Sequence, residues 1–136
     1  MINDEVAEDV FVMIFSWGIP YEDEIFRDLD GAGQRTAYGK VERVPLELIS
    51  RQYAKYSERD FYNAMVQDHS NRPAIVATYH GDLARLLEIK KLIRKKHEHL
   101  VPEHPGFIRD VIHSSDSREE YDAQSAIWEA YLNEQS

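Results

Sequence analysis

The sequence predicts an α+β fold in which one sheet is covered by helices. Three observations lead to this prediction. Four short segments rich in β-branched or aromatic residues alternate with segments of helical periodicity. The 136 residues are enough for one domain with a hydrophobic core, so a single domain over residues 1–136 is expected. Hydrophobic residues make up 43% of the chain and charged residues 30%, the balance of an ordinary globular protein.

The first half of the chain contains two strand patterns. The apolar run VFVMIFSW at residues 10–17 is typical of a strand buried on both faces. A helix follows, because Pro20 and the acidic residues after it are typical of a helix N-terminus. Gly31 and Gly33 interrupt the chain, and the alternating segment TAYGKVERV at residues 36–44 predicts the second strand.

The middle of the chain predicts helices around a third strand. Pro45 opens the helical segment PLELISRQYAKY, and RDFYNAMVQDH continues with Phe61 and Met65 one turn apart. Residues 73–81 form the third strand, which Gly81 ends. The longest helical pattern is DLARLLEIKKLIRKKHEHL at residues 82–100. Its apolar side is formed by Leu83, Leu86, Leu87, Ile89 and Ile93.

A loop, a fourth strand and a last helix complete the predicted elements. VPEHPG is the loop, and FIRDVIH at residues 107–113 is the strand. Ser117 with Glu120 predicts a capping box for a helix that runs past Trp128. The alternation of strands and helices fits the ferredoxin-like β-α-β-β-α-β sandwich, with an antiparallel four-stranded sheet covered by helices.

Charge and composition exclude several classes of protein. The formal net charge is −9, which argues against a binder of duplex nucleic acid, because such a protein needs a basic face. The chain has no cysteine, so disulfides and thiolate metal sites are excluded. Its start, MINDEVAEDV, is acidic, and no apolar run approaches the ~20 residues of a membrane span. A cytoplasmic protein without membrane contact is therefore expected.

The segment VIHSSDS contains the first candidate for chemistry. His113 stands at the end of a predicted strand, where open sheets place ligands. The helix that follows has free N–H groups that favour an anion, and a neutral imidazole is a good nucleophile near neutral pH. The alternative is a structural histidine, with Ser115, Asp116 and Ser117 acting as caps and turn residues.

Three further patterns have a functional and an ordinary explanation. The cations at residues 90–96 either form a phosphate-binding surface or a solvated helix end. His97, His99 and His104 either bind a metal or are simply solvated in a loop. The aromatic residues at positions 53–62 either stack on a nucleobase or pack in the core.

Several segments resemble the nucleoside diphosphate kinase family. RDVIHSSDSREEYDAQSAIWEAY resembles the family's R-N-I-I-H-G-S-D-S and the helix ending in W-F, and the spacing from His113 to Trp128 matches without a gap. RQYAKYSERDFYNAMV resembles E-H-Y-x-x-x-x-x-R-P-F-F-x-x-L-V, and NRPAIVATYHG resembles S-G-P-V-V-A-M-V-W-E-G. FVMIFSWG stands where the family has F-x-M-I-K-P-D-G.

The resemblance implies a ferredoxin-like fold, a homo-oligomer and a ping-pong reaction. A nucleoside triphosphate held with Mg²⁺ gives its γ-phosphate to a histidine, and a nucleoside diphosphate then collects it. His113 matches that histidine, Ser115 a hydroxyl close to it, and Gln124 a glutamate that orients the imidazole. Tyr53 matches a tyrosine near the phosphates. Phe61 matches the aromatic residue under the base, with Met65 matching an apolar residue beside it.

The chain also departs from the family pattern at the phosphate-binding positions. Phe15 replaces a lysine that contacts the transferred phosphate, and Ile89 replaces a phosphate-binding arginine. The segment before the histidine is shortened, so Arg109 has to serve as either of two arginines, and Asp110 replaces an asparagine. Four cations near the missing arginine's position are expected to be able to reach the phosphates from the same helix: Lys90, which is assigned to the nucleotide site, Lys91, Arg94 and Lys95. No protein metal ligands are expected.

Two functions therefore remain open from the sequence. The first is a phosphotransferase of the nucleoside diphosphate kinase type that works through phosphohistidine at His113. The second is a nucleotide-binding or protein-interaction module of the same fold that has lost turnover.

Overall fold

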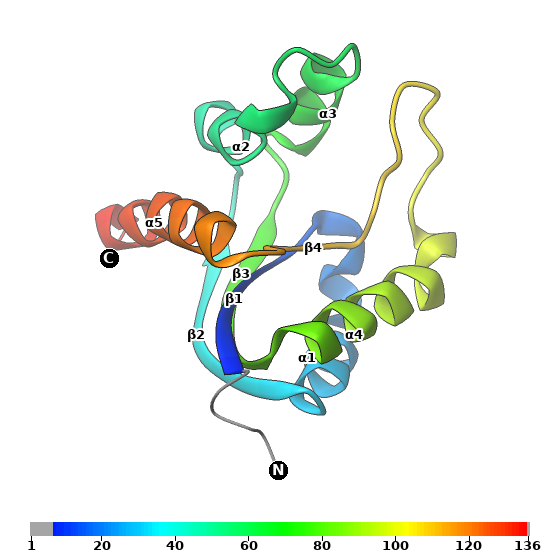
Figure 1. Ribbon diagram of the computed structural model, residues 1–136. Coiled ribbons are helices and arrows are strands. Elements are labelled where there is room, and N and C mark those ends of the chain that lie inside the picture. The colour runs from blue at the N-terminus through cyan, green and yellow to red at the C-terminus, as the bar shows by residue number, and fades with distance from the viewer. Residues whose placement is uncertain (1–6, 136) are drawn as a thin grey trace.

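A four-stranded antiparallel sheet forms the centre of the computed structural model, which describes residues 7–135 (Figure 1). Its strand order is β2-β3-β1-β4, and every neighbouring pair is antiparallel. The strands are β1 (Ala7–Ile14), β2 (Gly33–Val41), β3 (Ala74–Asp82) and β4 (Ile112–Ser114). This arrangement confirms the predicted α+β fold. The acidic start of the chain lies mostly outside the described residues.

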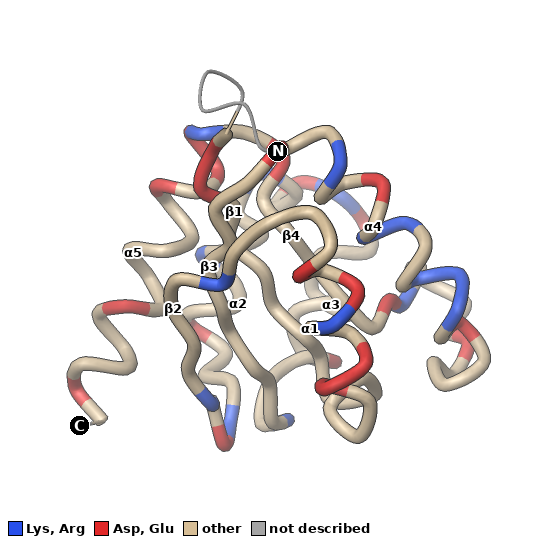
Figure 2. Tube along the Cα trace, turned by 90° about the horizontal axis from the view of Figure 1, so that it is seen from below, with Lys and Arg blue, Asp and Glu red and all other residues tan. Residues whose placement is uncertain are grey.

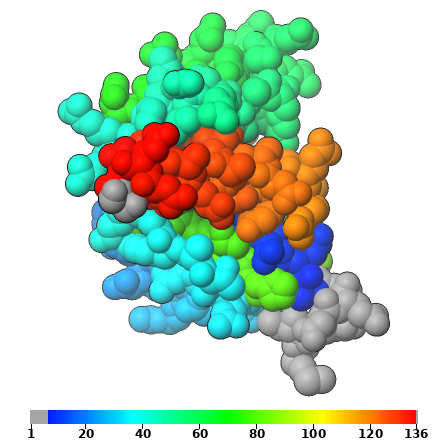
Figure 3. Space-filling model, turned by 90° about the vertical axis from the view of Figure 1, so that its left-hand side faces the viewer, coloured from blue at the N-terminus to red at the C-terminus, as the bar shows by residue number. Residues whose placement is uncertain are grey.

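Within residues 7–135, five α-helices lie on the two faces of the sheet. They are α1 (Glu22–Asp30), α2 (Leu46–Gln52), α3 (Tyr62–His69), α4 (Leu83–Lys96) and α5 (Arg118–Gln135). Helices α1 and α4 cover one face, and α5 with α2 and α3 covers the other (Figure 1). In the space-filling view, α5 is a continuous band below α2 and above β2 (Figure 3). None of the helices in residues 7–135 has the length and apolarity needed to cross a membrane.

Strand β1 is buried on both faces, as its apolar run predicts. Val10, Val12 and Ile14 belong to the apolar cluster under α1 and α4. Phe11 and Met13 alternate with them and belong to the cluster under α2, α3 and α5. Two-residue periodicity therefore sends alternate side chains of one strand into two separate cores.

Three strands, β1, β2 and β4, have other bounds in the structure than the sequence predicts. The first strand ends at Ile14, and residues Ser16–Tyr21 form a 3-10 turn containing Pro20. Gly18 makes this turn feasible, because a Cβ there would lie 3.0 Å from the Ile14 side chain and 3.2 Å from the Val111 carbonyl oxygen. The second strand begins earlier than expected, at Gly33, and ends at Val41. The last strand has only three residues, so residues 107–111 of its expected range are loop.

Helix α4 begins at an N-cap that orders its first turn. The Asp82 carboxylate accepts hydrogen bonds from the backbone N–H groups of Ala84 and Arg85 at 3.0 and 3.4 Å. The helix ends at Lys96 instead of reaching residue 100. His97 follows it and is 3% exposed, so the expectation that this histidine is solvated is wrong. Basic residues gather along α4, as the blue segments of Figure 2 show.

Helix α5 shows half of the predicted capping box. The Ser117 hydroxyl accepts the backbone N–H of Glu120 at 3.2 Å. The Glu120 carboxylate, however, lies 3.2 Å from Lys55 Nζ and is used in an ion pair between α5 and the segment after α2. The cap fixes the start of α5 directly after β4, which places His113 and Gln124 on adjoining elements.

Candidate active site

A cavity of about 510 Å³ opens at the β4 edge of the sheet, where the end of β1 meets the start of β4, between helices of the two layers. Its wall combines aromatic rings, three cations, three carboxylates and two histidines. The lining residues are Phe15, Gln52, Tyr53, Lys55, Tyr56, Phe61, Met65, His69, Lys90, Arg94, Phe107, Ile108, Asp110, His113, Ser114, Asp116, Glu120 and Gln124. A space of this size and mixed polarity fits a small organic ligand that carries charge.

His113 is held in one orientation on the wall of this cavity. It lies in the middle of β4 and pairs with Met13 of β1. Its Nε2 lies 2.9 Å from Oε1 of Gln124, on the second turn of α5. A carboxamide oxygen only accepts hydrogen bonds, so Nε2 carries the proton and donates it. In the neutral imidazole, Nδ1 then carries the free lone pair.

The environment keeps the His113 imidazole neutral. Burial lowers its pKa from 6.5 to about 4, while the hydrogen bond to Gln124 acts in the opposite direction. The nearby cations Lys90 and Arg94 lower the pKa further. At neutral pH the ring is therefore uncharged, with its proton on Nε2 and a nucleophilic lone pair on Nδ1.

Two cations from α4 enter the cavity, one turn apart. The Lys90 side chain is only 9% exposed, and its Nζ lies 3.1 Å from the Asp116 carboxylate. The Arg94 guanidinium donates to the carbonyl oxygen of Ile112 at 3.0 and 3.1 Å and lies 3.6 Å from Asp110. The cationic run of α4 is thus divided, because Lys90 and Arg94 line the cavity whereas Lys91 and Lys95 are exposed.

The charges around the cavity are balanced in pairs. Lys90 is paired with Asp116, Arg94 with Asp110, and Lys55 with Glu120. These six residues, all in the lining, carry no net charge when ionised. Burial raises the pKa of the Asp110 carboxyl, while Arg94 opposes that shift. A ligand rich in negative charge must therefore compete with carboxylates for each of these three cations.

Aromatic rings form the rest of the wall. The rings of Tyr53 and His113 form a T-shaped contact, with centroids 5.4 Å apart. Burial raises the pKa of the Tyr53 hydroxyl, so it stays protonated and can donate a hydrogen bond. Phe61 and Met65 lie one turn apart at α3 and face the cavity from the same side. Phe107 and Ile108, on the loop before β4, also line it.

Comparison with solved structures identifies the fold. A nucleoside diphosphate kinase of Aquifex aeolicus matches with a TM-score of 0.68 and 20% identity, covering 90% of this chain and 94% of that one. A nucleoside diphosphate kinase family protein of Babesia bovis matches at 0.66 and 17% identity, over 89% and 87% of the two chains. The chain has the nucleoside diphosphate kinase fold.

A third solved structure comes from Borrelia burgdorferi. It is a nucleoside-diphosphate kinase with bound vanadate and ADP, described as a transition state mimic, and it matches with a TM-score of 0.67 and 16% identity. The match covers 91% of this chain and 88% of that one. No protein-family model and no curated protein sequence matches the chain. The likeness to nucleoside diphosphate kinases is therefore carried by structure and by short motifs.

Ser115, named from the nucleoside diphosphate kinase motif, lies beside the cavity without lining it. Its side chain is buried, and its hydroxyl accepts the backbone N–H of Phe11 at 2.8 Å. Its own N–H donates to the Phe11 carbonyl oxygen at 2.9 Å. Both contacts extend the pairing of β1 with the chain after β4, so in this geometry Ser115 positions the backbone next to His113.

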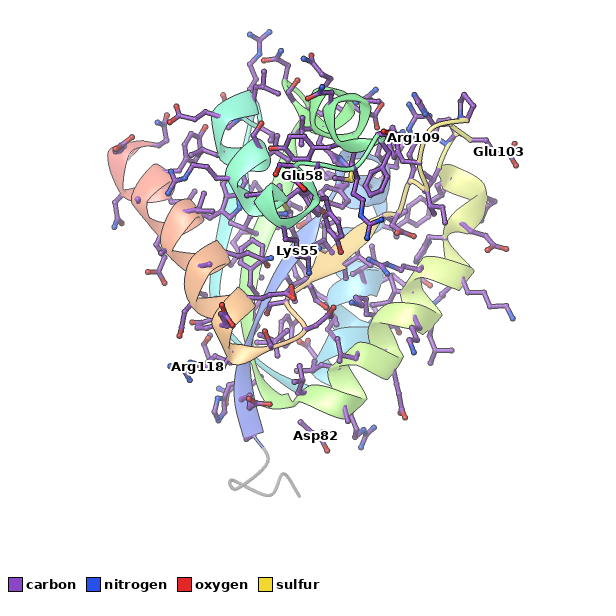
Figure 4. The ribbon with its side chains drawn as sticks, turned by 45° about the horizontal axis from the view of Figure 1, so that its top comes forward. Lys55, Glu58, Asp82, Glu103, Arg109 and Arg118 are labelled. Atoms are coloured by element: carbon purple, nitrogen blue, oxygen red, sulfur yellow. The ribbon has the colours of Figure 1, made fainter. Side chains whose placement is uncertain are left out.

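Arg109 does not reach the cavity wall. Its guanidinium forms a bidentate pair with the Asp68 carboxylate at 2.6 and 3.0 Å. The same group donates to the carbonyl oxygens of Pro102 and Glu103 at 2.9 and 3.2 Å. Figure 4 shows Arg109 beside α3, where the loop before β4 passes it. The structure thus uses the arginine expected to bind nucleotide to fasten this loop to α3.

Of the residues named from the sequence, His113, Gln124, Tyr53, Phe61, Met65 and Lys90 line the cavity together. Arg94, one of the cations expected near the phosphates, also lines it. Sequence reasoning missed His69 and gave Lys55 and Phe107 no place there. His69 had a detectable signal, because Phe61, Met65 and His69 recur every four residues and so share a helical face. Lys55 and Phe107 lie in irregular segments, where periodicity gives no direction for a side chain.

The histidines at positions 97, 99 and 104 form no metal centre in the described part of the chain. Within residues 7–135, no group of three or more His, Cys, Asp or Glu side chains is placed to hold a metal ion. His97 packs instead against the ring of Tyr21, with centroids 5.3 Å apart.

Proposed function

We propose that the protein is a phosphotransferase of the nucleoside diphosphate kinase type, acting through phosphohistidine at His113. The observation that carries the proposal is the hydrogen bond from His113 Nε2 to Gln124 Oε1. It leaves Nδ1 as the nucleophile of an imidazole that burial keeps neutral. The fold shared with nucleoside diphosphate kinases supports the choice of a nucleoside triphosphate as donor.

The proposed transfer balances without another reactant. The Nδ1 lone pair attacks the γ-phosphorus, an N–P bond forms, and the bond from that phosphorus to the bridging oxygen breaks. The nucleoside diphosphate leaves with the electron pair of this oxygen, and the ring becomes positively charged with its proton still on Nε2. A second nucleoside diphosphate takes the phosphoryl group by the reverse step. Gln124 stabilises the charged ring by its dipole alone, because a carboxamide carries no negative charge.

The cavity wall offers a place for each part of a nucleotide. Phe61 and Met65 provide an apolar surface for the base, and Lys90 and Arg94 lie near His113 to meet the phosphates. Mg²⁺ fits as a companion of the nucleotide, because it needs only one or two carboxylates beside the phosphates. Asp116 is the carboxylate that would contact it, and the ion would neutralise phosphate charge.

The second candidate is a nucleotide-binding module without turnover, and one observation favours it. Phe15 fills the position where the family resemblance places a lysine, and it lies in the cavity lining with 4% of its surface exposed. The missing cation removes charge stabilisation of the transition state worth about 3 kcal/mol or more. On the same ground, we propose slow turnover if the protein is an enzyme.

Labelling with γ-labelled ATP and Mg²⁺ tests the proposal. The wild-type protein should form an acid-labile, base-stable phosphoprotein, the label should be absent in His113→Ala, and it should pass to added GDP. His80→Ala is the matched control, since His80 is an exposed histidine on β3 whose Nδ1 lies 3.0 Å from Asp9. A wild-type protein that binds ADP but takes no label establishes the second candidate instead.

A second variant tests the part assigned to Gln124. Gln124→Glu keeps the hydrogen bond to Nε2 and adds a negative charge beside the ring. It should raise the rate of labelling, because the charged ring of the intermediate is then compensated. A labelling rate equal to or below that of the wild type would contradict the role given to Gln124.

A further inference from the structure

His69 is the one cavity histidine that the proposed function leaves without a task. It ends α3, lines the cavity and is only 6% exposed. Its ring makes contacts with three aromatic residues. Within residues 7–135, neither of its ring nitrogens has a hydrogen-bond partner, and its pKa is set by burial and by charges without any hydrogen bond.

The faces of the His69 ring are already occupied. Phe15 stacks on it with ring centroids 4.1 Å apart and planes 21° from parallel. Tyr53 lies nearly parallel at 6.2 Å, and Trp17 meets the ring with its edge at the same distance. Neither ring nitrogen is among the fully buried side-chain atoms that lack a hydrogen-bond partner, so the nitrogens keep some accessible surface. Because the His69 side chain lines the cavity, a polar group of a bound ligand can approach them there.

The residue that stacks on His69 occupies the position at which the family resemblance places a cation. Phe15 stands where the family resemblance places the lysine that contacts the transferred phosphate, and its ring lies directly against His69. On the other side of Tyr53 lies His113, the proposed phosphoryl acceptor, at 5.4 Å between ring centroids. A donor on His69 is therefore in the same aromatic cluster as the reacting ring, next to the position that lost its own donor.

We propose that His69 is a phosphate-binding residue of this cavity, whose ring N–H donates to a phosphate oxygen of the bound nucleotide in place of the missing cation at position 15. The proposal rests on the proposed function for the identity of the ligand, a nucleoside di- or triphosphate. The two proposals concern different residues, His113 and His69, and different bonds, and different measurements test them.

Protonation gives the proposal a second consequence. Burial lowers the pKa of His69 to about 4, Asp68 raises it, and His113, Arg72 and Arg109 lower it. At neutral pH, His69 is thus a neutral donor of a single proton. A phosphate group beside the ring adds negative charge and raises this pKa, so the bound state takes up a proton at a higher pH than the free state. Nucleotide affinity should therefore rise as the pH falls through about 5, a pKa about one unit above that of the free histidine.

The test follows the ring nitrogens of the intact wild-type protein by NMR while ADP and Mg²⁺ are added. The signals of His69 should shift on binding, and the pKa of His69 should rise by about one unit or more. Unchanged His69 signals at millimolar ADP overturn the proposal, whether or not another residue responds.

Two variants separate the hydrogen bond from the packing. His69→Phe keeps a ring to stack on Phe15 and removes both nitrogens, so ADP affinity should fall about tenfold or more while adenosine affinity stays the same. His69→Gln keeps an N–H donor and should recover part of the loss. If His69→Phe binds ADP as tightly as the wild type, the proposal fails. A comparison of the backbone amide spectra of His69→Phe and the wild type checks that the variant is folded.

The outcomes for the two proposals are distinct. A shifted His69 without any phosphoprotein contradicts phosphotransfer at His113 and leaves phosphate binding by His69 in place. A phosphoprotein that forms at His113 while the His69 signals stay fixed contradicts only the role of His69.

Discussion

The sheet has one face that is apolar throughout at β1 and one that mixes apolar and polar partners. Under α1 and α4, Val10, Val12 and Ile14 pack into a cluster with Ile25, Leu29 and Ile93. Under α2, α3 and α5, Phe15 stacks on His69, and Met13 Sδ accepts a hydrogen bond from Gln52 Nε2 at 3.6 Å. β1 thus packs into an apolar core on one side, while on the other Met13, and Phe15 directly after the strand, contact the cavity-lining residues Gln52 and His69.

The difference lies in the side chains at the helix junction of each face. On both faces the covering helices contact each other, α1 with α4 on the first and α2 with α3 and α5 on the second. On the second face, α2 and α3 lie at one end of the sheet and α5 runs beside them, as Figure 1 shows. Polar side chains near this junction pair with one another, as in the bond from Trp128 Nε1 to Gln52 Oε1 at 2.6 Å. We therefore expect the first face to govern stability and the second to govern binding.

The largest expected effect is on the apolar face. Ile93→Ala removes a fully buried side chain of α4 and should lower the free energy of unfolding by about 2–5 kcal/mol. Urea denaturation at neutral pH measures it. Leu92→Ala is the matched control on the same helix, because Leu92 is 62% exposed and should change stability by less than about 0.5 kcal/mol. Similar losses in both variants would contradict the expectation that the face under α1 and α4 governs stability.

Acid should destabilise the protein through the cavity face. His69 has a pKa of about 4 in the folded protein against 6.5 when unfolded, so the unfolded state binds more protons between these values. Stability is fully present above pH 6.5 and falls as the pH drops through this window, by roughly 2–3 kcal/mol at about pH 4.5 for this group. His69→Gln should lose less stability between about pH 7 and 4.5 than the wild type. Equal losses would show that His69 is not buried as a neutral ring.

A smaller effect is expected for the polar pair under α5. Trp128→Phe preserves most of the packing but leaves Oε1 of the buried Gln52 without its donor. The free energy of unfolding should fall by about 1–3 kcal/mol. Trp128→Phe combined with Gln52→Leu should regain part of it, because no polar atom then lacks a partner. If the double variant is less stable than Trp128→Phe, the hydrogen bond is not the cause.

The smallest effect on stability is expected at the cavity mouth. Lys55 is about half exposed, so Glu120→Gln should change the free energy of unfolding by less than about 1 kcal/mol. ADP affinity should rise severalfold in the same variant, because Lys55 is released from its carboxylate. Calorimetric titration with ADP and Mg²⁺ measures this change. An unchanged or lower affinity would mean that Lys55 does not meet the ligand.

Periodicity predicted the framework of the molecule but not its irregular parts. The continuous apolar run of β1 and the helical spacing of α4 are direct consequences of burial, so both elements could be predicted from the sequence. The end of β1 was missed, because the apolar run continues through Phe15 and Trp17 into a 3-10 turn. The short β4 was overestimated, because the apolar residues before it belong to a loop that lines the cavity.

The candidate site could be predicted where a motif carried it. The resemblance placed His113 and Gln124, and the structure brings them within hydrogen-bond distance. It assigned Arg109 to the nucleotide, but in the structure the guanidinium is paired with Asp68, which lies 41 residues away in sequence. Lys90 was expected near the phosphates, but its burial and its pairing with Asp116, 26 residues away in sequence, could not be foreseen from helical position alone.

The pairing of cations and carboxylates around the cavity also has a kinetic consequence. A mouth with three compensated pairs, in a chain of net charge −9, exerts no long-range attraction on an anionic ligand. Association with a nucleotide should therefore be slower than in an electrostatically steered complex, and raising the ionic strength should not slow it further. Under the proposed function, a nucleotide exchanges partners with the carboxylates only at short range, so its selection should occur after encounter and not during approach.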